Sequence, residues 1–241
     1  MGGLRSYFAS DIHLRLDRPD RGHRFAAWVR TIDPADPLTI VGDLCDFWYA
    51  SRQRRDDPMA CPGLRALAEY SGRGGTLTIL PGNHDTWLGP HFERHLGARV
   101  VPNPLELDAF GLRLHLTHGH LVGGRGPLKS LMEGRAFLHA FGAVPGPLAR
   151  GLETVLDRSN DRNLPASTRK HMNAFRRYAS RLDPAIDLAV FGHVHRHPID
   201  DDSGRPRWIV LGDWLHGSSY LTIDAAGARL TVEPGGAGHG E

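Results

Sequence analysis

Three short apolar runs in the first third of the chain constrain its fold, because each leads directly into polar residues. The runs span residues 7–9, 38–41 and 77–80. Short runs rich in branched apolar residues are typical of buried strands. Segments with helical spacing of apolar residues lie between them, at about residues 23–32 and 64–71. This alternation of strand and helix predicts an α/β fold with crossover connections.

The second half of the chain has a different pattern. Residues 105–117 alternate around a Phe-Gly pair like a β-hairpin, whereas residues 121–181 show no strand pattern and are expected to be helical. Strand character then returns at residues 188–191, 208–211, 220–223 and 229–232. Because no helical segment separates these late strands, we expect a second, more antiparallel sheet packed on the first.

These patterns predict one domain over residues 1–233, with a helical lid inserted at residues 121–181 and a disordered, glycine-rich tail at residues 234–241. The formal net charge of the chain is only +2, so its charge indicates no nucleic-acid partner. The two cysteines, Cys45 and Cys61, suit a reducing compartment, and we expect Cys45 to lie in the core. No apolar run has the length of a signal peptide or a membrane span, so we expect a cytoplasmic protein.

Five clusters of potential metal ligands follow the strand-like runs, at residues 11–13, 42–46, 82–85, 118–120 and 192–195. Open α/β sheets bind their ligands beyond the carboxyl ends of strands, so five loops that are distant in sequence can converge on one crevice. Each cluster alone is a weak signal, because Gly-Asp and Gly-Asn are also ordinary turn pairs. All five together, each at a strand end, predict a metal centre.

The candidate ligands are carboxylates, imidazoles and one amide oxygen, which suit manganese, iron or zinc. They are too many for one ion. A carboxylate can bridge two ions, so two ions that share Asp43 would each receive four protein ligands and stand about 3.5–4 Å apart. Such a pair is suited to phosphoryl chemistry. The seven candidate ligands are Asp11, His13, Asp43, Asn83, His118, His193 and His195.

The order of these motifs resembles that of the calcineurin-like metallophosphoesterase superfamily, from Asp11 to His195. The resemblance implies a two-sheet sandwich flanked by helices and a hydrolase with two divalent ions, which we expect to be manganese, with iron or zinc as alternatives. It also implies that Asn83 and His84 bind the substrate, where His84 contacts the phosphate or protonates the leaving group. Asp85 would orient the His84 ring. The implied ligand sets are Asp11, His13, Asp43 and His195 for one ion, and Asp43, Asn83, His118 and His193 for the other.

Two segments, residues 42–48 and 211–214, are similar to those of the UDP-2,3-diacylglucosamine diphosphatases of lipid A synthesis. That family hydrolyses a pyrophosphate in a diacylated UDP-sugar to UMP and a lipid monophosphate at the inner membrane surface, and it carries a helical insertion like residues 121–181. Where many members have Asp, this chain has His120, and His84 replaces the Arg of one branch.

The insertion is strongly cationic and also rich in apolar residues. We expect some of its apolar side chains to line an acyl-chain pocket, and its basic residues to meet substrate phosphate and anionic lipid. The candidate substrate-binding residues there are Arg125, Lys129, Arg169 and Lys170. Two alternatives stay open, namely a calcineurin-like phosphoesterase for nucleotides, phosphoproteins or other phosphodiesters, and a non-catalytic scaffold on the same fold.

Overall fold

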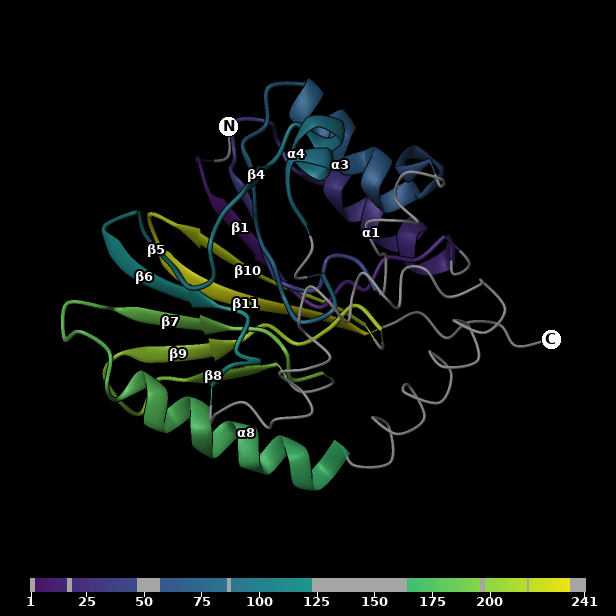
Figure 1. Cartoon of the computed structure of the whole chain (residues 1–241). Coiled ribbons are helices and arrows are strands. Elements are labelled where there is room, and N and C mark those ends of the chain that lie inside the picture. Colours follow the sequence, from purple (N-terminus) through teal and green to yellow (C-terminus); the bar gives the residue numbers. More distant parts are fainter. Residues whose placement is uncertain are drawn as a thin grey trace.

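Two β-sheets pack face to face between layers of helices (Figure 1). The computed structural model describes residues 3–16, 19–46, 57–85, 88–122, 164–195, 198–215 and 217–234. The elements in chain order are β1 Ser6–Ala9, α1 Pro19–Thr31, β2 Leu38–Val41, the 3-10 turn Pro58–Ala60, α3 Pro62–Gly72, β3 Leu77–Leu80, α4 Pro90–Leu96, β4 Arg99–Val100, β5 Leu105–Ala109, β6 Leu112–Thr117, α8 Leu164–Ala179, β7 Leu188–Phe191, β8 Ile199–Asp201, β9 Arg207–Val210, β10 Gly217–Asp224 and β11 Gly227–Pro234.

The first sheet has six strands in the order β11-β10-β1-β2-β3-β4. Strands β1 to β4 run parallel, so the carboxyl ends of β1, β2 and β3 lie at one edge of the sheet. Helices α1 and α3 make the crossovers between them, as the alternating sequence pattern predicts.

The second sheet has five strands in the order β5-β6-β7-β9-β8. Its central strands β6, β7 and β9 are parallel, and antiparallel strands flank them on both sides. The expectation that the late strands form the second sheet is therefore wrong for two of them. Strands β10 and β11 belong to the first sheet, where β10 pairs antiparallel with β1 and contributes Leu221 and Ile223 to the core between the sheets.

Three apolar layers hold the elements together. Side chains such as Phe25, Ile40 and Leu67 fill the space between the first sheet and α1, α3 and α4. A second layer lies between the two sheets, and a third joins the second sheet to α8, where Phe175 stacks on Phe191 with ring centroids 4.5 Å apart. Helix α8 covers the outer face of the second sheet in Figure 1. The arrangement confirms the predicted two-sheet sandwich flanked by helices.

The predicted helical insertion is described only in part. Helix α8 is the described helix within it, and residues 123–163 lie outside the described residues. Pro234 ends β11 and does not begin the tail, and residues 235–241 also lie outside the described residues. No helix in the described part of the chain is both long enough and apolar enough to cross a membrane.

Candidate active site

Four of the candidate ligands sit on an unusual backbone. Asp11, His13, Asp43 and His193 have positive φ angles of 53°, 50°, 51° and 68°. This left-handed conformation costs a residue with a β-carbon about 1–3 kcal/mol and persists only where neighbours hold it. Here the loops after β1 and β2 hold each other, because Asp11 N donates to Gly42 O at 3.2 Å and His13 N donates to Asp43 O at 3.0 Å.

The first ligand group consists of Asp11, His13 and His195, whose ligand atoms all lie within 4.8 Å of one another. His195 Nε2 lies 3.2 Å from Asp11 Oδ1 and 3.1 Å from His13 Nε2. His13 Nε2 lies 3.8 Å from the same Asp11 oxygen. Three side chains from the ends of β1 and β7 thus point at one place.

The second group consists of Asp43, His118 and His193, with Asn83 beside it. His118 Nε2 lies 3.2 Å from both Asp43 Oδ2 and Asn83 Oδ1. Its other ring nitrogen, Nδ1, lies 3.0 Å from Val41 O. A hydrogen bond from Nδ1 to that carbonyl leaves the Nε2 lone pair directed at the centre, which is how metal-binding histidines are usually oriented.

Asp43 lies between the two groups. Its Oδ2 atom is 3.2 Å from His118 Nε2 in one group and 3.7 Å from His13 Nε2 in the other. Its Oδ1 atom accepts the backbone N–H of His84 at 2.9 Å. The carboxylate is therefore fixed in a position from which Oδ2 reaches both groups.

Two carboxylate oxygens in these groups fit the need for a cation. Asp11 Oδ1 and Asp43 Oδ2 are buried and have no hydrogen-bond partner among the described residues, although each faces imidazole nitrogens. Burial raises the pKa of both carboxyls, but the neighbouring histidines, His118 above all, hold both pKa values well below the ordinary range. Buried, ionised oxygens without a hydrogen bond are costly unless a cation lies against them, so these donors fit a divalent metal.

Three glycines let the ligand loops approach one another. A β-carbon on Gly82 would lie 2.1 Å from Asp43 Oδ1, and one on Gly42 would lie 2.3 Å from His118 Nδ1. A β-carbon on Gly192 would lie 2.0 Å from Ser10 Oγ. The glycine that precedes each of these motifs thus provides the space that a neighbouring loop occupies.

The partner of His84 differs from the prediction. Its Nδ1 atom lies 2.7 Å from Asp46 Oδ1, and the two oxygens of Asp85 instead accept the backbone N–H groups of Gly82, at 2.6 Å, and Cys45, at 3.2 Å. Asp85 therefore joins two loops, while Asp46 orients the ring. The reason is that residues 14 and 45 continue the pairing of the β1 and β2 loops, which brings Asp46 beside His13 and His84.

The two carboxyls have opposite pKa shifts. Burial and the nearby Asp43 raise the pKa of Asp85 to about 6. Burial also raises the pKa of Asp46, but its hydrogen bonds with His13 and His84 lower the pKa by more than burial raises it. The pKa of Asp46 therefore lies well below the ordinary value. Asp46 stays anionic and can hold a cationic ring. It lies in the Gly-Asp-x-x-Asp motif, and that motif is the signal by which the sequence could have identified it.

Two further histidines lie beside the second group. The His120 ring is buried, with its centroid 5.4 Å from that of His118. The His171 ring, on α8, is 5.3 Å from that of His193. Nothing in the sequence around His171 indicates this proximity, because it depends on how α8 packs on the second sheet.

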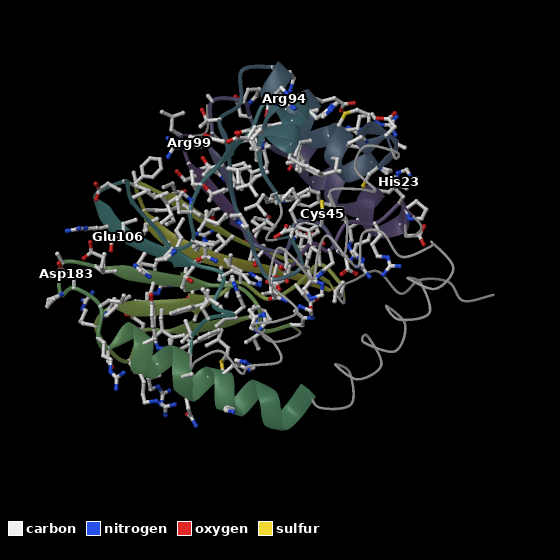
Figure 2. All side chains as sticks on the ribbon, in the orientation of Figure 1. His23, Cys45, Arg94, Arg99, Glu106 and Asp183 are labelled. Atoms are coloured by element: carbon white, nitrogen blue, oxygen red, sulfur yellow. The ribbon has the colours of Figure 1, made fainter. Side chains whose placement is uncertain are left out.

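The remaining predicted residues are described less fully. Lys170 is exposed on α8, the Arg169 side chain is not among the described side chains, and Arg125 and Lys129 lie outside the described residues. Cys45 is buried in the core, as expected, and Figure 2 labels it near α1.

Comparison with known proteins identifies the family. The model of the calcineurin-like phosphoesterase family matches residues 4–197. The chain is 28% identical over 240 residues to a protein named UDP-2,3-diacylglucosamine hydrolase from Aeromonas salmonicida (strain A449), covering 94% of this chain and 92% of that protein. It is 29% identical over 260 residues to the protein of the same name from Pseudomonas aeruginosa (strain UCBPP-PA14), covering 94% and 98%.

The solved structures that the chain matches share little sequence with it. The E. coli phosphoesterase Yfce has a TM-score of 0.47 at 18% identity, covering 92% of this chain and 88% of that one. A dimetal phosphatase from Danio rerio has a TM-score of 0.46 at 14% identity, with 97% of each chain covered. Because the family model matches residues 4–197 of its 241 residues, this chain, a metal-dependent hydrolase, belongs to the calcineurin-like phosphoesterase family.

Proposed function

We propose that the chain is a two-metal hydrolase of the pyrophosphate bond in UDP-2,3-diacylglucosamine, with UMP and a lipid monophosphate as products. The observation that carries the two-metal part is the pair of ligand groups joined at Asp43 Oδ2. The names of relatives at 28–29% identity, which the chain matches over nearly their full length, support the substrate.

In this proposal Asp11, His13, Asp43 and His195 hold one ion, and Asp43, Asn83, His118 and His193 hold the other. Manganese is the ion we expect, with iron or zinc as alternatives, because the set contains carboxylate, imidazole and amide donors. Bound divalent ions supply an activated water and neutralise charge on the phosphate.

His84 is the residue that we assign to the phosphate or the leaving group. Asp46 engages its Nδ1 atom at 2.7 Å, so the ring is oriented with Nε2 as the atom for substrate. The pKa of His84 is raised, since its attraction to Asp43 and Asp46 outweighs the lowering by burial. A protonated imidazole can donate a hydrogen bond to a phosphate oxygen, or a proton to the departing group.

The lipid part of the substrate is assigned to the insertion. We propose that residues 121–181 cover the site, that their apolar side chains enclose an acyl chain, and that Arg125, Lys129, Arg169 and Lys170 meet phosphate and anionic head groups. Such contacts would also hold the protein at the inner membrane surface from the cytoplasmic side. Each enclosed methylene would contribute up to about 0.8 kcal/mol, so acyl burial would dominate selectivity.

A product assay on purified protein with manganese tests the proposal. UDP-2,3-diacylglucosamine should give UMP with a catalytic efficiency far above that for its deacylated counterpart, a dinucleoside polyphosphate or an aryl phosphodiester. A ratio near one between the acylated and deacylated sugars would reject the lipid pocket and favour another phosphoester substrate. Absence of any hydrolysis with two ions bound would favour a scaffold.

Two variants test the assigned roles. Asp43→Ala should abolish turnover and reduce bound metal, because it removes the carboxylate that reaches both groups. Near-normal activity with two ions per chain would contradict bridging.

His84→Ala should lower kcat by roughly two to four orders of magnitude with metal content intact, the usual effect of losing an acid or base. Loss of metal in step with activity would show that His84 supports the ligand groups instead.

A further inference from the structure

Two arginines on α1 reach from the helix layer to the ligand loops. Arg21 donates from its guanidinium NH1 to the backbone carbonyl of His13 at 2.8 Å. Arg24 donates from its NH2 to the backbone carbonyl of Trp214. Because the two arginines are three positions apart, they extend from the same side of the helix.

Trp214 connects the second of these contacts to a ligand. Its backbone N–H donates to the carbonyl of Asp11 at 3.1 Å. Its ring is fully buried and packs against Phe25 and Trp28 of α1, with centroids 5.1 Å and 5.0 Å away. Arg24 therefore acts on Asp11 through a residue that α1 also holds by packing.

Arg21 and Trp214 contact the backbone carbonyls of the loop after β1, whereas the loop after β2 contacts its N–H groups. The N–H groups of Asp11 and His13 are bonded to the loop after β2, whereas the carbonyls of the same two residues receive Trp214 N and Arg21. Both residues have positive φ, a conformation that relaxes unless its neighbours maintain it. Removal of the carbonyl partners would free one side of the loop.

We propose that Arg21 and Arg24 are positioning residues that set the affinity of the first ligand group, Asp11, His13 and His195, for its ion. This inference rests on the proposed two-metal function. The second ion would depend on them much less, because the backbone contacts of the two arginines fall on the loops that carry His13 and Trp214. Partners of this kind typically change metal affinity by about 10–100-fold.

The test is calorimetric titration of metal-free protein with manganese, with elemental analysis after dialysis. Arg21→Gln and Arg24→Gln should each lower the affinity for one of the two ions by roughly 10–100-fold and leave the affinity for the other at the wild-type value. Arg21→Lys should restore much of the loss, because an ammonium can still donate to a carbonyl. Arg30→Gln is the matched control, since Arg30 lies on the same helix in an exposed pair with Glu69, and both ions should bind it normally.

A double-mutant cycle identifies which ion is weakened. If the arginine acts on the first group, Arg21→Gln should add little metal loss to His195→Ala but should weaken the remaining ion in His118→Ala. Thermal unfolding of each metal-free variant separates misfolding from lost affinity, and Arg21→Lys keeps the test valid if a glutamine variant fails to fold.

The outcomes divide cleanly. Equal weakening of both ions, or unchanged binding in folded Arg21→Gln and Arg24→Gln, would overturn the inference. If wild-type protein binds two ions but hydrolyses no phosphoester, the proposed function fails, and selective loss of one ion in the variants would still support the positioning role. A wild-type chain that binds no divalent ion would overturn both.

Discussion

Asp46→Asn tests whether the contribution of His84 to kcat depends on a charged partner that orients its ring. The substitution keeps the size of the side chain but removes the charge from an oxygen 2.7 Å from His84 Nδ1. Hydrogen bonds that involve a charged group contribute about 1.5–3 kcal/mol. If that amount stabilises the transition state through His84, kcat should fall by about 10- to 150-fold, at about 1.4 kcal/mol per factor of ten.

The assay measures kcat, KM and bound manganese together, because Asp46 also lies 3.8 Å from His13 Nδ1 and 3.4 Å from Arg15 NH1. We expect kcat to fall while KM and the metal content stay close to wild type. Asp85→Asn is the matched control. It replaces a buried acceptor of two backbone N–H groups, so it should lower the unfolding temperature more than it lowers kcat per folded, metal-loaded chain. A wild-type kcat in Asp46→Asn, or a larger loss of kcat in Asp85→Asn, would refute the assignment of Asp46 as the orienting residue.

Three other perturbations have defined outcomes. Gly82→Ala should weaken metal binding and activity by tenfold or more, because its β-carbon would lie 2.1 Å from Asp43 Oδ1, whereas Gly72→Ala, whose β-carbon would meet nothing within 4 Å, should have normal activity. Chelation should lower Tm by roughly 5–11 °C relative to protein with ions at about 100 times their Kd, which corresponds to about 2.7 kcal/mol; an unchanged Tm would argue against metal in the buried groups. Tyr70→Phe should reduce the free energy of unfolding by about 1–2 kcal/mol in a denaturant titration without changing kcat. It removes the hydroxyl that donates to Asp36 O at 2.5 Å, before the amino end of β2, whereas the ligand loops follow the carboxyl ends of the strands.

The parts of the site that could be predicted depend on local pattern and on parallel pairing. Strands β1, β2 and β3 are short apolar runs that are followed within three residues by Asp11, Asp43 and Asn83, and their parallel order brings those loops together. The same reasoning applies to His118 and His193 after β6 and β7, which are also parallel neighbours.

The parts that could not be predicted depend on long-range geometry. Strand β10 looks like any amphipathic strand in the sequence, and its pairing with β1, which lies near the other end of the chain, leaves no local signal. Asp46 and Asp85 are both carboxylates near His84, and the paths of the two loops decide which one meets the ring. Strands β4 and β8, of two and three residues, are too short for a periodic signal.

The pairing of β1 with β10 has a consequence for how the chain is made. Residues 6–8 pair with residues 221–223, and Asp11 accepts a hydrogen bond from the backbone of His193. At about 5–20 residues per second, the ribosome needs roughly 10–40 s to add the 200 or so residues that separate these partners. Until then β1 has a neighbour on one side only, and Asp11 and His13 lack His195, the third member of their group, for most of that time. Uptake of the ion that we propose for the first group would therefore be a late event in biogenesis, which follows synthesis of most of the domain.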